Sequence, residues 1–164
     1  MQAITHFLVG ALIQKFLFGW LHLPWNFLLV IVLAILSHFV VDVFVKITFH
    51  TPEPYPEWRF WVIANTSFYI ASLITAIILF IPYWWAMLAA NVIDIYDWVI
   101  LRPVQAVKRK KNPEYTLEKY MIHPRIERFR DKHLTWVPNL LYDPKGVIPE
   151  IIIDIILFLL LYLL

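Results

Sequence analysis

Residues 27–45 read FLLVIVLAILSHFVVDVFV, and only Ser37, His38 and Asp42 are polar in this stretch. A helix that crosses the hydrocarbon layer of a bilayer needs about 20 mostly apolar residues. A helix on the surface of a soluble protein would instead keep one polar face along its length. The stretch therefore predicts a transmembrane helix, extended by its flanks to about residues 26–49, that carries a His and an Asp inside the membrane.

The rest of the chain has the same character. Of its 164 residues, 61% are apolar and 16% are charged, whereas soluble domains have about 45–50% apolar and about 25% charged residues. Prolines at 24, between 52 and 56, and at 82 interrupt the apolar runs, because proline lacks the backbone donor that would continue a helix. We expect an all-α, polytopic membrane helix bundle that forms a single domain over residues 1–164, with five transmembrane helices at about 3–21, 26–49, 60–81, 83–101 and 147–164. Pro82 is expected to form a tight hairpin between the third and fourth of these helices.

The segment 102–146 differs from the apolar segments because it holds 11 of the 14 Lys and Arg residues, including the run KRKK at 108–111. Such a segment cannot span a membrane. The cytoplasmic loops of membrane proteins carry an excess of Lys and Arg. The segment is therefore predicted to be a basic cytoplasmic insertion in a multi-pass protein of the cell membrane, with the N-terminus on the same side.

Several short ionisable side chains fall inside the predicted helices, where a charge is costly and needs an explanation. At a rise of about 1.5 Å per residue, they all lie in the half of the membrane that adjoins the 102–146 segment. The group comprises His6, His38, Asp42, Asp94, Asp97, Glu150 and Asp154. Residues four apart, such as His38 and Asp42, share one face of a helix. The agreement in depth predicts one shared polar site.

Carboxylates that face each other in a low-dielectric pocket repel, so a metal ion or a proton must offset their charge. The chain has no cysteine, and any metal must therefore be held by His, Asp, Glu or backbone oxygen. We expect one or two divalent ions, zinc in the first place, with magnesium or manganese as alternatives. The expected metal ligands are His6, His38, Asp42, Asp94 and Asp97, with Asn91 beside them as a substrate-binding residue. Whether Glu150 and Asp154 join the site is left open.

The stretch HPRIERFRDKH at 123–133 adjoins the predicted mouth of this site. His123 and His133 are expected to be catalytic, as groups that donate and accept protons. Arg125 is expected to bind an anionic group of the substrate. The alternative interpretation is an ordinary basic segment held by anionic lipid headgroups.

Four short motifs resemble those of a known family. They are Thr5-His6, the His-xxx-Asp pair of His38 and Asp42, Asp94-Ile95-Tyr96-Asp97, and His123-Pro124-Arg125 with His133. They are similar to motifs of the membrane-bound predicted metal-dependent hydrolases, the YdjM-like family, although the His-xxx-Asp helix comes second here rather than last. The resemblance implies a metal centre that is used for hydrolysis, by similarity to zinc-dependent phospholipase C.

Functions of different classes stay open at this point. The first is a membrane-embedded metal-dependent hydrolase acting on a lipid or polyprenyl phosphate at the cytoplasmic leaflet. The second is a proton- or cation-coupled transporter that uses the same groups as a relay. The third is a lipid-binding scaffold without enzymatic activity, in which the polar residues only specify helix packing. The expected partners are membrane lipids and a lipid or phosphate-bearing substrate, with no nucleic acid, and oligomerisation is left open.

Overall fold

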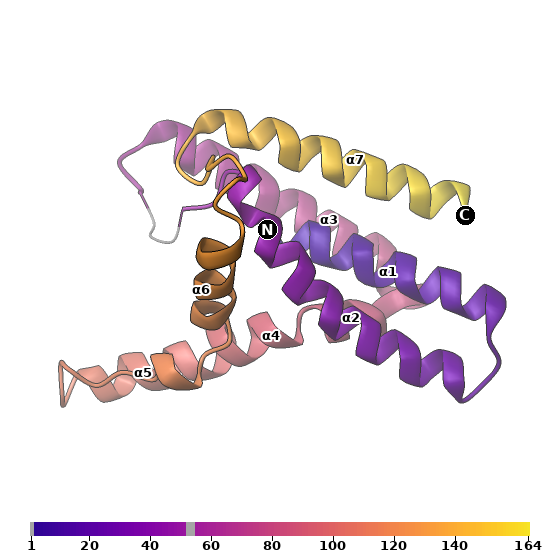
Figure 1. The fold of residues 1–164 in the computed structure, drawn as a ribbon, viewed down its shortest axis with the longest axis horizontal. Helices are drawn as coiled ribbons and strands as arrows, with labels where there is room; N and C mark the ends of the chain where they lie inside the picture. Colours follow the sequence, from indigo (N-terminus) through magenta and orange to yellow (C-terminus); the bar gives the residue numbers. More distant parts are fainter. Residues whose placement is uncertain (1, 52–54) are drawn as a thin grey trace.

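The computed structural model describes residues 2–51 and 55–164, and within them it contains helices and loops but no strands. Four helical segments are long and apolar enough to cross a membrane (Figure 1). They are α1 (Ala3–Trp20), α2 (Trp25–Val43) with η1 (Phe44–Ile47), α3 (Arg59–Ala90), and α7 (Val147–Leu163) preceded by η4 (Pro144–Gly146). The predicted all-helical architecture with membrane-length apolar helices is confirmed.

The predicted hairpin at Pro82 is wrong, because α3 is helical on both sides of this proline. A single proline removes one backbone hydrogen bond, and membrane helices tolerate that loss. Helix α1 packs against α3 at this point, where the Gln14 side-chain amide donates to the carbonyl oxygen of Pro82 over 2.7 Å. The described residues therefore contain four helices of membrane length, and the expected count of five is not confirmed.

The helical path breaks instead at Asn91, whose backbone N–H is shared between the carbonyls of Met87 and Leu88. Three short helical pieces follow without a gap. They are α4 (Val92–Asp94), the π-helical η2 (Ile95–Leu101) and α5 (Arg102–Arg109). The region expected as a fourth span is therefore split between the end of α3 and the start of this second helical stretch.

Helix α1 occupies the centre of the bundle and contacts α2, α3 and α7. Its core residues Leu8 and Ala11 form one buried apolar cluster with Leu79, Met87 and Leu161. Close approach to α3 depends on Gly10, because a Cβ at this position would lie 2.7 Å from the carbonyl oxygen of Ala86. The same packing brings the N-terminal turns of α1 beside the C-terminal turns of α2 and α3.

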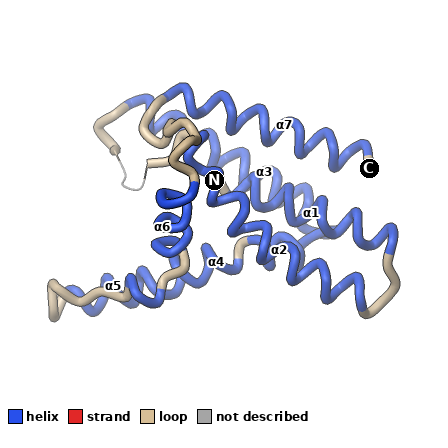
Figure 2. The backbone as a smooth tube through the Cα atoms, in the orientation of Figure 1, coloured by secondary structure: helices blue, strands red, loops and turns tan. Residues whose placement is uncertain are grey.

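The basic segment packs back onto the bundle. It contains α5, η3 (Glu118–Tyr120) and α6 (His123–His133), and α6 runs across the direction of α1, α2 and α7 (Figure 2). Ile126 of α6 is buried against Val43 of α2 in a second apolar cluster with Leu134 and Val137. Backbone hydrogen bonds then tie residues 140 and 141 to residues 46 and 50. The segment thereby places the start of α6 beside the polar end of α2.

Candidate metal centre

Three histidines and two aspartates from four helices meet at the end of the bundle that α6 crosses. They are His6 of α1, His38 and Asp42 of α2, Asp94 of α4 and His123 of α6. Their nitrogen and oxygen atoms form two groups that could hold a metal ion, His6–His38–Asp42 and His38–Asp94–His123, and His38 belongs to both. Within each group the ligand atoms lie within 4.8 Å of one another.

The separations of these atoms suit a small divalent ion. The Oδ1 atom of Asp42 lies 3.2 Å from His6 Nε2. Its Oδ2 atom lies 3.1 Å from His38 Nε2 and 3.2 Å from His123 Nε2. Asp94 Oδ1 lies 3.1 Å from His123 Nε2 and 4.0 Å from His38 Nε2. Ligands bonded to zinc at about 2.0–2.1 Å in a tetrahedron are about 3.4 Å apart. The set therefore needs only small adjustments to close around such an ion.

The proton on His38 can be placed from its surroundings. Its Nδ1 lies 2.7 Å from the carbonyl oxygen of Ala90, which can only accept a hydrogen bond, so Nδ1 carries the hydrogen. In the neutral ring Nε2 then presents a lone pair. This buried nitrogen makes no hydrogen bond within the described chain, although it faces the carboxylate of Asp42. A lone pair aimed at a carboxylate is repelled unless a proton or a metal ion lies between them, and the metal ion gives the arrangement of a metal-binding His with an oriented second nitrogen.

His123 is oriented in the same way by Asp97. Its Nδ1 lies 2.7 Å from Asp97 Oδ2, and the backbone N–H groups of Ile122 and His123 donate to the same carboxylate over 2.8 Å each. The buried Asp97 thus caps the start of α6 and holds the His123 ring. The sequence predicts Asp97 as a metal ligand. In the structure it lies behind His123 and belongs to neither ligand group.

His6 completes the buried side of the cluster. Its ring stacks on His38 with a centroid distance of 4.1 Å and an interplanar angle of 15°. Two adjacent imidazoles that are both charged would repel, whereas neutral rings can stack and share one ion. His6 and His38 are almost fully buried, and the side chains of His123 and Asp94 are 18% and 31% exposed. Among the described residues of the cluster, His123 and Asp94 have the most exposed side chains, so their side is open to solvent or to a ligand.

The charge balance also favours a cation. Burial lowers the pKa of His123, but its hydrogen bonds with Asp42 and Asp94 and the charge of Asp42 outweigh burial and raise that pKa to about 10. The ring therefore lies in a strongly negative potential. Such a potential attracts a divalent ion as well as a proton.

The other predicted site residues lie outside the two ligand groups. The Asn91 side-chain amide donates to the carbonyl of Met87 over 2.8 Å and is buried. Arg125 is exposed and donates to the carbonyl of Lys119. His133 lies at the far end of α6 against Phe129, with a centroid distance of 4.6 Å and the two rings tilted by 39°. The structure therefore brings His6, His38, Asp42 and Asp94 together, and it places His123 in one of the two ligand groups.

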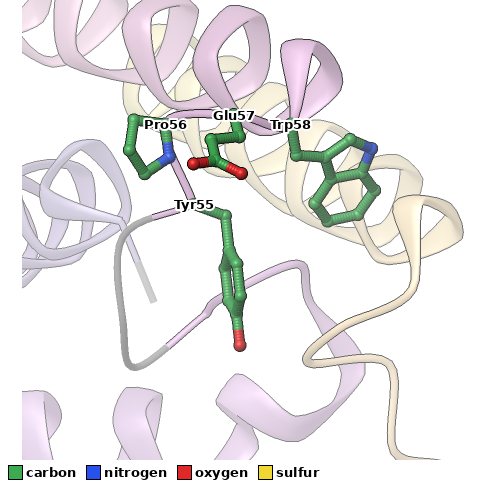
Figure 3. Close-up of a pocket in the computed structure, with 4 residues that line it drawn as sticks. All are labelled: Tyr55, Pro56, Glu57 and Trp58. Carbon is green, nitrogen blue, oxygen red and sulfur yellow. The ribbon is translucent and has the colours of Figure 1, made fainter.

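The carboxyls of Glu150 and Asp154, which were left open, form a second polar cluster with α1. The Thr5 hydroxyl lies 3.1 Å from Glu150 Oε1 and 2.8 Å from Asp154 Oδ1, and the backbone N–H of Gln2 donates to Glu150 Oε1. Neither carboxyl belongs to a ligand group. A shallow pocket elsewhere, before α3, is lined by Tyr55, Pro56, Glu57 and Trp58 and contains none of the predicted site residues (Figure 3).

Two interactions that orient the histidine ligands could not be predicted from the sequence. The orienting group of His38 is a backbone carbonyl, which leaves no trace in residue types. The orienting role of Asp97 depends on a contact with α6, and its spacing from Asp94 suggested direct ligation instead. Comparisons with family models, with curated proteins and with solved structures give no match to this chain.

Proposed function

We propose that this protein is a membrane-embedded metal-dependent hydrolase that acts on a lipid or a phosphate-bearing amphiphile. The observation that carries the proposal is the convergence of three His Nε2 atoms on Asp42 and Asp94, with His38 and His123 oriented through their other nitrogens. Oriented imidazoles and carboxylates are the ligand set of hydrolytic zinc sites. Zinc held there would lower the pKa of a bound water toward neutrality.

The residues of the chain have distinct roles in this proposal. His6, His38 and Asp42 would form the closed, buried side of the centre, and Asp94 and His123 would form its open side. Asp97 would keep the lone pair of His123 on Nε2 by accepting from Nδ1. The sequence predicts a proton-transfer role for His123, whereas this proposal assigns it to metal binding. The partly exposed Asp94 is the carboxylate best placed to accept a proton from an entering water.

The surroundings of the centre support a lipid-like substrate. The ligands lie at one end of helices that are long and apolar enough to span a membrane, so a substrate reaching the open side would come from the headgroup region. The basic segment that supplies His123 favours the cytoplasmic leaflet by the positive-inside rule. The motif resemblance to the YdjM-like family points to the same chemistry and stays a prediction.

The direct test is elemental analysis of the purified protein together with His38→Ala, because His38 belongs to both ligand groups. We expect a divalent metal in the wild type, zinc in the first place, and its loss from the variant together with loss of phospholipid hydrolysis in mixed vesicles. His133→Ala is the matched control, since this His lies at the other end of α6. A wild type without metal, or a His38→Ala variant with unchanged metal and activity, would refute the proposal.

The structure offers less support for the transport alternative. A relay across the membrane needs polar groups in both halves, and the polar residues farther along α1 are Gln14 and Lys15. Both donate to backbone carbonyls, those of Pro82 and Leu161, over 2.7 Å each. Each of these contacts joins α1 to a neighbouring helix, which is the role of a packing interaction. Metal-dependent cation flux in liposomes would nevertheless favour transport over hydrolysis.

A further inference from the structure

Asp94, a metal ligand in the proposed centre, lies on a helical stretch that leads away from that centre. The helical stretch formed by α4, η2 and α5 carries Asp94, Trp98 and Arg102 at intervals of four residues. Side chains four apart fall on nearly the same face of an α-helix, and the wider turns of a π-helix keep them close to alignment. Figure 1 shows that α4 lies near α2 and α6, and that α5 leads outward from there. The three side chains therefore form a row that starts at the open side of the metal centre.

Contacts between side chains join this row to the centre. The ring of Trp98 lies 5.9 Å from the ring of His123, centroid to centroid. The guanidinium carbon of Arg102 lies 4.9 Å from the Trp98 ring centroid, in a cation–π arrangement. Trp98 is 46% exposed, so the stack lies on the surface of the molecule. Arg102 is thus held one aromatic ring away from a metal-ligand side chain.

Arg102 also differs from the other arginines of the 102–146 segment in what its guanidinium contacts. Each of the other four donates to an acceptor no more than six residues away in the chain. These are Arg109 to the Tyr115 carbonyl, Arg125 to the Lys119 carbonyl, Arg128 to the Pro124 carbonyl and Arg130 to the Asp131 carboxylate. Within residues 2–51 and 55–164, Arg102 has the Trp98 ring as its contact and no hydrogen-bond acceptor. Its N–H groups are available to a ligand.

We propose that Arg102, held over Trp98, binds the phosphoryl group of the substrate at the mouth of the metal centre, which makes the substrate class a phosphorylated amphiphile. The planar guanidinium matches the oxygens of a phosphate with two parallel hydrogen bonds. Stacking on Trp98 restricts the arginine before the ligand arrives, which reduces the entropy lost on binding. The exposed apolar neighbours Val99 and Ile100 suit a position beside the acyl region of the bilayer. This inference rests on the proposed metal centre.

The test uses the metal-loaded full chain in nanodiscs of phosphatidylcholine, titrated with inorganic phosphate as the probe and with acetate as the comparison anion. Calorimetry reports the affinity, and elemental analysis reports the metal content of each sample. We expect Arg102→Gln to weaken phosphate binding by at least about tenfold, because a charge-assisted hydrogen-bond pair is lost. Arg102→Lys should restore part of the affinity, since it keeps the charge but not the planar fork. Arg128→Gln, a surface arginine of α6, is the matched control and should bind phosphate as the wild type does.

The outcomes separate this inference from the proposed function. Unchanged phosphate affinity in Arg102→Gln, with metal still bound, would overturn the role of Arg102 and leave the metal centre intact. An equal loss of affinity in Arg128→Gln would also overturn it, because the effect would then come from general surface charge. Tighter binding of acetate than of phosphate would overturn the substrate class. A wild-type protein without metal would instead refute the proposed function itself.

Discussion

Replacement of Asp97 by Asn tests how the metal centre is held together. The carboxylate accepts hydrogen bonds from the backbone N–H groups of Ile122 and His123 and from His123 Nδ1. The Asn side chain has nearly the same shape but only one acceptor oxygen, and its amide nitrogen donates. When that amide faces Nδ1, the His123 ring must place its hydrogen on Nε2. A protonated Nε2 cannot bind a metal ion.

The size of the effect follows from the contact that is lost. A hydrogen bond to a charged group contributes about 1.5–3 kcal/mol, which corresponds to a roughly 10- to 150-fold loss of metal affinity at 1.4 kcal/mol per factor of ten. Loss of a residue that orients a metal ligand lowers the metal affinity of a site by about 10- to 100-fold. Because Asp97 also caps α6, we expect the variant to unfold more easily by about 0.5–2 kcal/mol. Competition with a chelator of known affinity measures the first effect, and thermal unfolding in detergent measures the second.

Asp131→Asn is the control for Asp97→Asn, because it makes the same chemical change on α6. The Asp131 carboxylate is 61% exposed and pairs with its neighbour Arg130, so we expect metal affinity and unfolding temperature to stay at the wild-type values. If Asp97→Asn held metal as tightly as the wild type, the assignment of His123 as an oriented metal ligand would be incorrect. Equal losses in both variants would attribute the effect to the net charge of the segment.

Three further predictions concern the packing that brings the site together. Gly10→Ala should destabilise the bundle by about 1–3 kcal/mol, because the new Cβ would lie 2.7 Å from the Ala86 carbonyl oxygen. The control Gly19→Ala adds a Cβ with nothing within 4 Å and should leave the thermal unfolding temperature unchanged. Thr5→Val should lower the free energy of unfolding by about 1–3 kcal/mol, because it removes the hydroxyl that contacts both Glu150 and Asp154. Thr5→Ser keeps the hydroxyl and should be as stable as the wild type, so equal stability of the two variants would contradict this role of the hydroxyl. Gln14→Leu should lower stability by about 0.6–1.7 kcal/mol through loss of the bond to the Pro82 carbonyl, and denaturant unfolding with no change of midpoint would show that this bond does not support α3.

Within the candidate site, the sequence was most informative about depth and least informative about roles. Rise per residue placed His6, His38, Asp42 and Asp94 in one half of the bundle, because helix geometry converts sequence position directly into height. It could not separate Asp94, which faces the cluster, from Asp97, which lies behind His123. That difference depends on how η2 is rotated against α6.

The turn predicted at Pro82 failed for a related physical reason. Proline removes one backbone hydrogen bond wherever it occurs, but whether the helix continues depends on how it packs against neighbouring helices. Helix α1 packs against α3 at this point, and its Gln14 amide, 68 positions away in the chain, donates to the Pro82 carbonyl. The actual break falls at Asn91, which carries no proline signal.

The sequence by itself determined that the chain forms long apolar helices and that its buried His and Asp residues collect near one end of them, because hydrophobicity and helical rise are local properties. The tertiary structure alone decided which of these side chains meet. It brought His123 from the basic segment onto Asp42, placed the Ala90 carbonyl behind His38, and set Arg102 over Trp98 beside the open side of the cluster. These contacts depend on the relative rotation and docking of helices, which packing fixes between residues far apart in the chain.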